Sequence, residues 1–190
     1  RDLGPAYTAA FGKPKAILVI SAHSLTREPV LLAAERHEAI YDFGGFPDAL
    51  YQLRYAAPGA PALAQRVAGL LAAAGLPAHV VNEGGLDHGI WTPLRSMVPE
   101  ADIPVLPLAW PPNWSPAQLF GLGQALAPLA GEGVLIIGSG AMTHNLRLWS
   151  GGRGPIDAPE HPESAAFRNW FLDRTVEHDW PALFDYRTRA

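Results

Sequence analysis

The sequence predicts a single α/β domain with a mostly parallel central sheet that helices cover on both faces. Short, apolar, β-rich runs alternate with longer helical segments along the chain, and this alternation is typical of βαβ units. The length of 190 residues suits one sizeable core. Nineteen glycines and nineteen prolines supply turns in a chain whose hydrophobic fraction, 48%, is normal for a globular protein.

The expected strands and helices alternate in chain order. Five β-rich runs are expected to form strands, at residues 15–21, 29–34, 78–82, 103–109 and 133–139. Helices are expected at residues 59–77, 88–98, 115–130 and 162–177, with a weaker one at 181–190. The start at Ser115 is the clearest, because serine is a good cap and Pro116 suits the first helical turn. With no internal repeat or linker in sight, we expect one domain over residues 1–190.

Composition excludes several classes of protein. The net charge of -4 argues against nucleic acid and against an anionic membrane surface as partners. The absence of cysteine removes disulfides, thiolate metal ligands and a cysteine nucleophile, so any metal must be held by histidine and carboxylate. No apolar run is long enough for a transmembrane helix and no signal peptide is visible, so we expect a cytoplasmic protein.

Three histidines occupy equivalent places in the alternation of strands and helices. His23, His88 and His144 each follow a predicted strand. Parallel strands end at one edge of a sheet, where ligands bind in open α/β folds. Imidazole serves readily as a metal ligand or as an acid and base near neutral pH. A single such histidine is more often structural, but the shared location of three favours a functional site.

The other four histidines are expected to lie in polar loops or on helix surfaces without a functional role: His37, His79, His161 and His178. Near His88, Asp87 is expected to orient its imidazole or pair with its charge, and Trp91 to offer a flat wall for an aromatic substrate. Residues 40–55 gather aromatic side chains and Asp42 around a Gly-Gly turn. This segment fits a substrate-lining loop and ordinary loop packing equally well.

Five stretches of the chain form a recognisable series of motifs: in order, PKAILVISAH, YDFGGFPDALYQLRYAAPGAPALAQRV, GLDHGIWTPL, ADIPVLPL and SGAMTHNLR. Together they resemble the class III extradiol ring-cleavage dioxygenases, specifically the DOPA 4,5-dioxygenase-like (LigB-type) branch. The resemblance implies a metal centre of Fe(II) or Zn(II), with one ion per protomer in the complete enzyme. It also implies a small catechol-type aromatic substrate and O2 as co-substrate, which is inserted beside the diol to open the ring.

The resemblance also implies roles for the three histidines. His23 matches a metal ligand of the family. His144 matches the histidine of the HNL motif, which is proposed there as an acid and base and can approach the metal as an additional ligand. His88 matches the histidine of the DHG motif, which faces the substrate and would be catalytic together with His144. An Fe(II) ion with two histidines and one further ligand keeps positions open for catechol and O2.

Two parts of the family pattern do not occur in this chain. Members of the family carry another ligand histidine in an N-terminal HG motif and a third ligand near the C-terminus. We therefore expect the 190 residues to lack an N-terminal and a C-terminal segment of the complete enzyme, and to bind metal weakly alone. Ser24 also stands where an aromatic residue follows the histidine in relatives.

Other functions stay open at this point. A zinc-dependent hydrolase could use His23 and His144 with a metal-bound water. A serine hydrolase built on Ser139 and His144 is less favoured, because IIGSGAM lacks the G-x-S-x-G turn. A catalytically inactive binding protein of the same fold is a further alternative. The identity of the catechol, the choice between iron and zinc, and the oligomeric state are not predicted.

Overall fold

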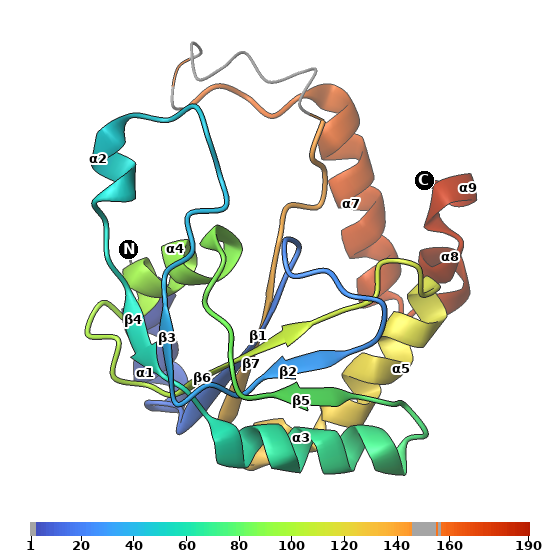
Figure 1. Cartoon of the computed structure of the whole chain (residues 1–190). Coiled ribbons are helices and arrows are strands. Elements are labelled where there is room, and N and C mark those ends of the chain that lie inside the picture. The colour runs from blue at the N-terminus through green and yellow to red at the C-terminus, as the bar shows by residue number, and fades with distance from the viewer. Residues whose placement is uncertain (1–2, 146–154, 156) are drawn as a thin grey trace. The chain divides into compact units, whose positions relative to one another are not determined.

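The computed structural model describes residues 3–145, 155 and 157–190. The chain forms two compact units. The first comprises Arg1–Trp114 and Leu119–Gly140, and the second comprises Ser115–Gln118 and Ala141–Ala190. The first unit holds all the described strands, and the second holds the helices that follow them (Figure 1).

The elements of the first unit, with α5 beginning in the second, are α1 (Leu3–Phe11), β1 (Ala16–Ser21), β2 (Val30–Leu32), β3 (Arg36–Glu38), α2 (Asp48–Tyr51), β4 (Ala56–Pro58), α3 (Pro61–Ala73), β5 (His79–Val81), α4 (His88–Met97), β6 (Val105–Ala109), α5 (Pro116–Leu126), α6 (Pro128–Gly131) and β7 (Val134–Ser139). Every strand and helix expected in this unit is present, usually with shorter bounds. The helix expected at 115–130 is divided into α5 and α6, since Pro128 has no amide hydrogen to continue it.

The main sheet has five strands in the order β5-β2-β6-β1-β7. All neighbouring pairs are parallel except β2 and β6, which run antiparallel. The fold class predicted from the sequence is therefore confirmed. In the pairing of β1 with β7, Ser21 lies opposite Ser139, so the two strands end at the same level.

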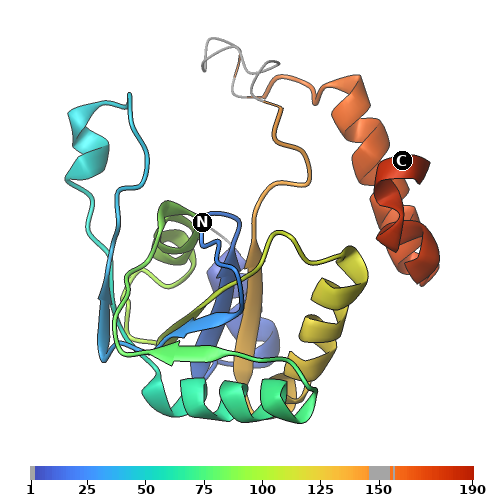
Figure 2. The same ribbon diagram turned by 45° about the vertical axis from the view of Figure 1, so that its right-hand side comes forward.

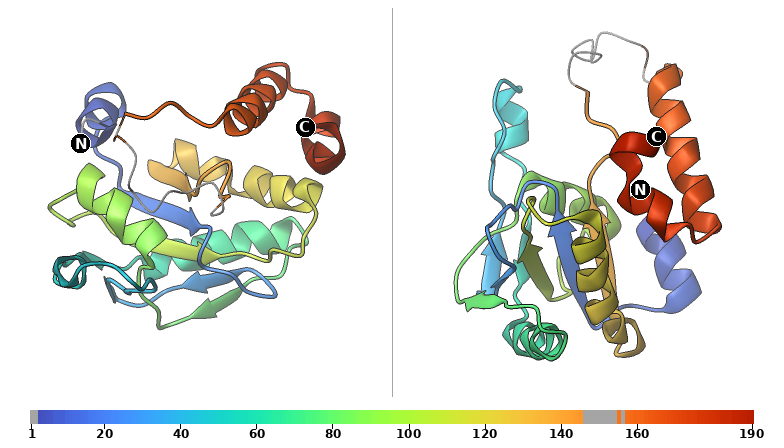
Figure 3. Two further views of the ribbon diagram at one scale, coloured as in Figure 1. Left: turned by 90° about the horizontal axis from the view of Figure 1, so that it is seen from above. Right: turned by 90° about the vertical axis from the view of Figure 1, so that its right-hand side faces the viewer.

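Helices cover both faces of this sheet. Side chains of β1 alternate between the two faces, so the strand presents apolar residues to the helices on each. Leu18 packs in a core with residues of α3, α5 and α6, whereas Ile17 and Val19 pack with residues of α4 and β4 on the opposite face. Figure 2 shows α3 below the sheet and α4 above it. The right panel of Figure 3 views α3 nearly along its axis, on the same side of the strands.

Some elements were not expected from the sequence. The antiparallel pair β3 and β4 forms a separate two-stranded sheet, and α2 lies in the segment that joins these two strands. β3 and β4 have three residues each and α2 has four, and β4 ends in a proline, so none of the three gives a recognisable periodic pattern. This small sheet matters because it carries residues 39–47 toward the site described below.

His37 departs from its expected position. It is fully buried in β3 and not in a polar loop, and neither of its ring nitrogens has a hydrogen-bond partner among the described residues. Burial lowers the pKa of His37 below its usual 6.5, although backbone groups of Gly84, Val105 and Leu32 act in the opposite direction. The folded protein therefore favours the neutral imidazole.

The second unit contains α7 (Pro162–Val176), α8 (Trp180–Phe184) and α9 (Tyr186–Arg189), which confirms the helices expected at 162–177 and 181–190. The ring of Phe167 contacts those of Trp170, Phe171 and Tyr186, which joins α7 to the C-terminal helices. Within the described residues, no helix combines the length and the hydropathy that a membrane span requires.

We predict that His37 makes the folded protein sensitive to acid. Because its pKa is lower in the folded state, the unfolded chain takes up the proton first, and stability falls from about pH 6.5 down to the lowered pKa. Urea denaturation over this range should reveal the slope, which is at most about 1.4 kcal/mol per pH unit for one group. His37→Leu should reduce the slope, and His161→Gln, at an exposed position, should not. Equal slopes in His37→Leu and wild type would contradict the prediction.

Candidate metal and catalytic site

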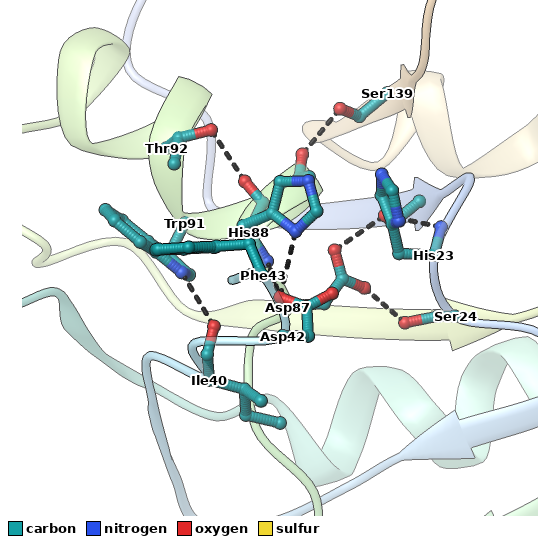
Figure 4. A network of polar contacts seen from close by, with 12 residues as sticks. His23, Ser24, Ile40, Asp42, Phe43, Asp87, His88, Trp91, Thr92 and Ser139 are labelled. Atoms are coloured by element: carbon teal, nitrogen blue, oxygen red, sulfur yellow. Dashed lines mark hydrogen bonds and ion pairs between the residues drawn. The ribbon is translucent and has the colours of Figure 1, made fainter. Parts of the chain in front are cut away.

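Two of the three predicted histidines lie against each other at the carboxyl edge of the sheet. His23 lies two residues beyond the end of β1, and His88 is the first residue of α4. Their ring centroids are 4.0 Å apart with an angle of 47° between the planes. Figure 4 shows the two imidazoles side by side. His23 is exposed and His88 is partly buried, so a ligand can reach both.

Asp42 is the hydrogen-bond partner of His88. Its Oδ1 accepts from the backbone N–H of His88 at 2.8 Å and lies 2.9 Å from the Nδ1 atom of the same residue. Burial by itself would raise the pKa of Asp42, but the backbone and side-chain hydrogen bonds from His88 outweigh it and lower the pKa below its usual value. Asp42 is thus held as a carboxylate beside the imidazole.

The expectation that Asp87 orients His88 is wrong. The Asp87 carboxyl group instead accepts hydrogen bonds from the hydroxyls of Ser21, at 2.7 Å, and Ser24, at 2.5 Å (Figure 4). The Ser21 hydroxyl oxygen in turn accepts from the backbone N–H of His23 at 3.1 Å. Asp87 therefore binds the segment that carries His23.

The first turn of α4 also lies close to the ends of β1 and β7. The Ser139 hydroxyl donates to the carbonyl oxygen of Gly89 at 2.5 Å. A Cβ atom on Gly89 would lie 2.4 Å from Ser21 Oγ and 3.1 Å from His23 Cδ2, so only glycine fits at this close approach. Since Ser139 uses its hydroxyl proton in this contact, the structure gives no support to a serine hydrolase built on it.

Aromatic side chains lie beside the histidine pair. The Phe43 ring meets the His88 ring edge-on at 5.6 Å, and Phe46 contacts Phe43 at the same centroid distance. Trp91 is only 2% exposed and donates its indole N–H to the carbonyl oxygen of Ile40 at 3.0 Å. The expectation that Trp91 forms a wall of the substrate site is therefore wrong, because the core covers its ring. Phe46, which is 45% exposed, is accessible.

His144 lies in the second unit and is exposed there. The predicted approach of His144 to His23 is thus a relation between two units, and it stays a prediction. Sequence reasoning expected His23 and His88 to meet, and they do, but its premise that their strands end at one edge is wrong. β5 pairs parallel with β2, and β2 runs antiparallel to β6 and so to β1, so β5 ends at the opposite edge and residues 82–87 carry the chain to His88. Sequence reasoning also noted Asp42 without assigning it to His88. The contact between Asp42 and His88 joins residues 46 positions apart, which no local pattern signals.

The residues near His23 have the chemistry to hold a divalent metal ion. Possible ligand atoms of His23, Asp42 and His88 all lie within 4.8 Å of one another. Two imidazoles and one carboxylate are the donor set of many non-haem iron oxygenases, which leave coordination positions open for substrate and O2. Because metal–nitrogen bonds are about 2 Å long, ligands of one ion lie roughly 3–4 Å apart, so small side-chain rotations would suffice. The donor set therefore fits iron or zinc.

Comparisons with known proteins point to one family. The profile of the family described as "Catalytic LigB subunit of aromatic ring-opening dioxygenase" matches residues 4–189. The 4,5-DOPA dioxygenase extradiol of Beta vulgaris is 46% identical over 179 residues, which are 94% of this chain and 65% of that protein. The protein of the same name from Escherichia coli K12 is 45% identical over 161 residues, 83% of this chain and 57% of that protein.

A solved structure agrees with these matches. The crystal structure of an uncharacterized protein from Escherichia coli K12 has a TM-score of 0.71 and 35% sequence identity, and the match covers 90% of this chain and 63% of that one. The chain spans less than two thirds of the length of each of these three relatives.

We predict that Gly89→Ala displaces the segment that carries His23. The added methyl group would collide with Ser21 and His23, and such overpacking typically lowers the free energy of unfolding by about 1–3 kcal/mol. Gly121→Ala in α5 is the matched control, because nothing lies within 4 Å of its Cβ position and alanine favours a helix by roughly 0.5–1 kcal/mol. Urea denaturation of both variants should give shifts of opposite sign. Two stabilising shifts would refute the close approach at Gly89.

Proposed function

Because the chain belongs to the family of the catalytic LigB subunit of aromatic ring-opening dioxygenases, we propose that it forms part of a metal-dependent extradiol dioxygenase. The reaction would open the ring of a small catechol-type aromatic substrate with O2. The observation that carries this proposal is the pair of His23 and His88, with Asp42, at the carboxyl edge of the sheet. Open α/β sheets bind their ligands at this edge.

The proposed metal ligands in this chain are His23 and His144, and the proposed ion is Fe(II) or Zn(II), with one ion per protomer. When bound, this ion would supply Lewis-acid activation of the catechol oxygens. Both side chains are exposed, so neither would have to leave a core in order to bind an ion. Asp42 and His88 lie close enough to be considered as ligands, but their mutual hydrogen bonds favour a different role.

His88 is proposed as a group that accepts and returns a proton of the substrate. An ionised carboxylate only accepts hydrogen bonds, so the nitrogen that faces Asp42, Nδ1, carries the ring hydrogen of the neutral imidazole. Its Nε2 atom then keeps a free lone pair. A catechol hydroxyl within hydrogen-bond distance of Nε2 can give its proton to His88. His144 is proposed to act as a further acid and base.

The aromatic side chains beside His88 support an aromatic substrate. Phe43 stands edge-on to the His88 ring, and Phe46 continues the aromatic surface outward. Aromatic rings favour edge-to-face and offset arrangements at centroid distances of about 4.5–7 Å, so a substrate ring can add to this cluster. A catechol would thereby bring its two hydroxyls toward His88 while its ring contacts phenylalanine.

The experiment that tests the function uses the full-length gene product, loaded with Fe(II) under anaerobic conditions and mixed with DOPA as the probe and O2. We expect one O2 to be consumed per DOPA and a ring-opened product that contains both oxygen atoms. His144→Gln should lower turnover by roughly two to four decades, the range for loss of an acid–base group. His161→Gln should retain turnover. Hydrolysis without O2 uptake would favour a zinc-dependent hydrolase, and binding without turnover an inactive binding protein.

We also predict that Asp42 acts through His88. Asp42→Asn should lower kcat for DOPA about 10- to 100-fold, because the negative charge that stabilises the protonated His88 imidazole is lost, while the metal content stays equal to that of the wild type. The exposed Asp48 of α2 provides the control, and Asp48→Asn should change neither quantity. Metal analysis together with steady-state kinetics distinguishes the possible roles. Loss of the metal from Asp42→Asn would show that Asp42 is a ligand.

A further inference from the structure

Asp87 is a buried acidic side chain without the usual structural roles. It is 6% exposed and precedes the first residue of α4, where aspartate commonly caps a helix by accepting from a backbone N–H. Its side chain makes no such capping bond. It also forms no ion pair with any residue in the described part of the chain. Burying a carboxyl group is costly unless hydrogen bonds compensate, so its partners show what it does.

Those partners flank His23 on both sides. Oδ1 of Asp87 accepts from Ser21 and Oδ2 accepts from Ser24, so one carboxyl group holds both ends of the four-residue segment 21–24. The Ser21 hydroxyl oxygen also accepts a hydrogen bond from the backbone N–H of His23, so Asp87 holds the His23 backbone through Ser21. The ring of His23 is therefore exposed, while the backbone that carries it is held by hydrogen bonds to Asp87 and Ser21.

Asp87 is also the direct neighbour of His88. Figure 4 shows its carboxyl group below the two imidazoles, bonded toward the His23 side, while Asp42 bonds to His88. The absence of a side chain at Gly89 allows the first turn of α4 to lie against Ser21 and His23. Residues 87–89 thus include His88 and also contact the segment that carries His23, through the Asp87 carboxyl group and the close approach at Gly89.

We propose that Asp87 is a positioning residue that fixes the spacing of His23 and His88 by binding the Ser21 and Ser24 hydroxyls. This inference rests on the proposed function, in which His23 binds the metal and His88 faces the substrate. Without the Ser24 bond, the segment 21–24 would be held at one end only. Metal binding would then have to order His23, and this ordering would cost part of the binding free energy. Metal affinity and turnover would then both fall although no ligand is removed.

The test measures the affinity for Zn(II), by competition with a chelator, and the turnover of DOPA with Fe(II) in the full-length gene product. Ser24→Ala should weaken Zn(II) binding and lower kcat by about 10- to 100-fold, as loss of an outer partner of a metal ligand typically does. Ser24→Thr keeps the hydroxyl and should restore both to near wild-type values. Ser96→Ala, at an exposed position of α4, should change neither. If circular dichroism shows that Asp87→Asn is folded, this variant should lose Zn(II) affinity and DOPA turnover to the same extent as Ser24→Ala.

His23→Ala separates failure of this inference from failure of the proposed function. If His23→Ala abolishes Zn(II) binding while folded Ser24→Ala and Asp87→Asn bind like wild type, the positioning role is overturned and the proposed function stands. If His23→Ala binds Zn(II) like wild type, the ligand assignment in the proposed function is overturned. A double variant of Asp87→Asn and Ser24→Ala that is no weaker than either single variant would support one shared interaction.

Discussion

The position of β1 between β6 and β7 is the constraint on which the site depends. Ile17 and Leu18 are fully buried on opposite faces, so β1 is held from both sides as well as along both edges. Because β1 and β7 are parallel and end at the same level, the chain leaves both strands at one edge of the sheet. His23 follows this exit within two residues, so the core fixes where its imidazole can lie.

The small sheet of β3 and β4 adds a carboxylate and aromatic side chains to the histidine pair at the end of the main sheet. The segment between these strands brings Asp42, Phe43 and Phe46 to the edge where His88 begins α4. A carboxylate and an aromatic surface are thereby added to a pair of imidazoles. This layout combines a rigid base, which carries the histidines, with a loop that adapts the site to a class of substrate.

Two acidic residues divide the task of holding the two histidines. Asp42 binds the imidazole of His88 directly, and Asp87 holds the backbone of His23 through two serine hydroxyls. Asp87 is adjacent to His88 in the sequence, but its carboxyl group bonds to the two serines while the His88 ring bonds to Asp42. Asp87 has extended backbone at the N-cap position and the helix begins only at His88, so the two side chains leave the chain in different directions.

The sequence by itself determined the chain order of the main-sheet strands and the longer helices, the mostly parallel sheet, and the place of His23 just beyond the end of β1. These follow from local hydrophobic periodicity, which nearby residues encode. The meeting of His88 with His23 was decided by the tertiary structure, because β5 runs antiparallel to β1. Only the tertiary structure decided that Asp42 binds His88, that Asp87 binds Ser21 and Ser24, and that Trp91 and His37 are buried. Contacts such as Asp42 with His88 join residues far apart in the chain, and burial depends on which layers pack together, so no short stretch of sequence contains this information.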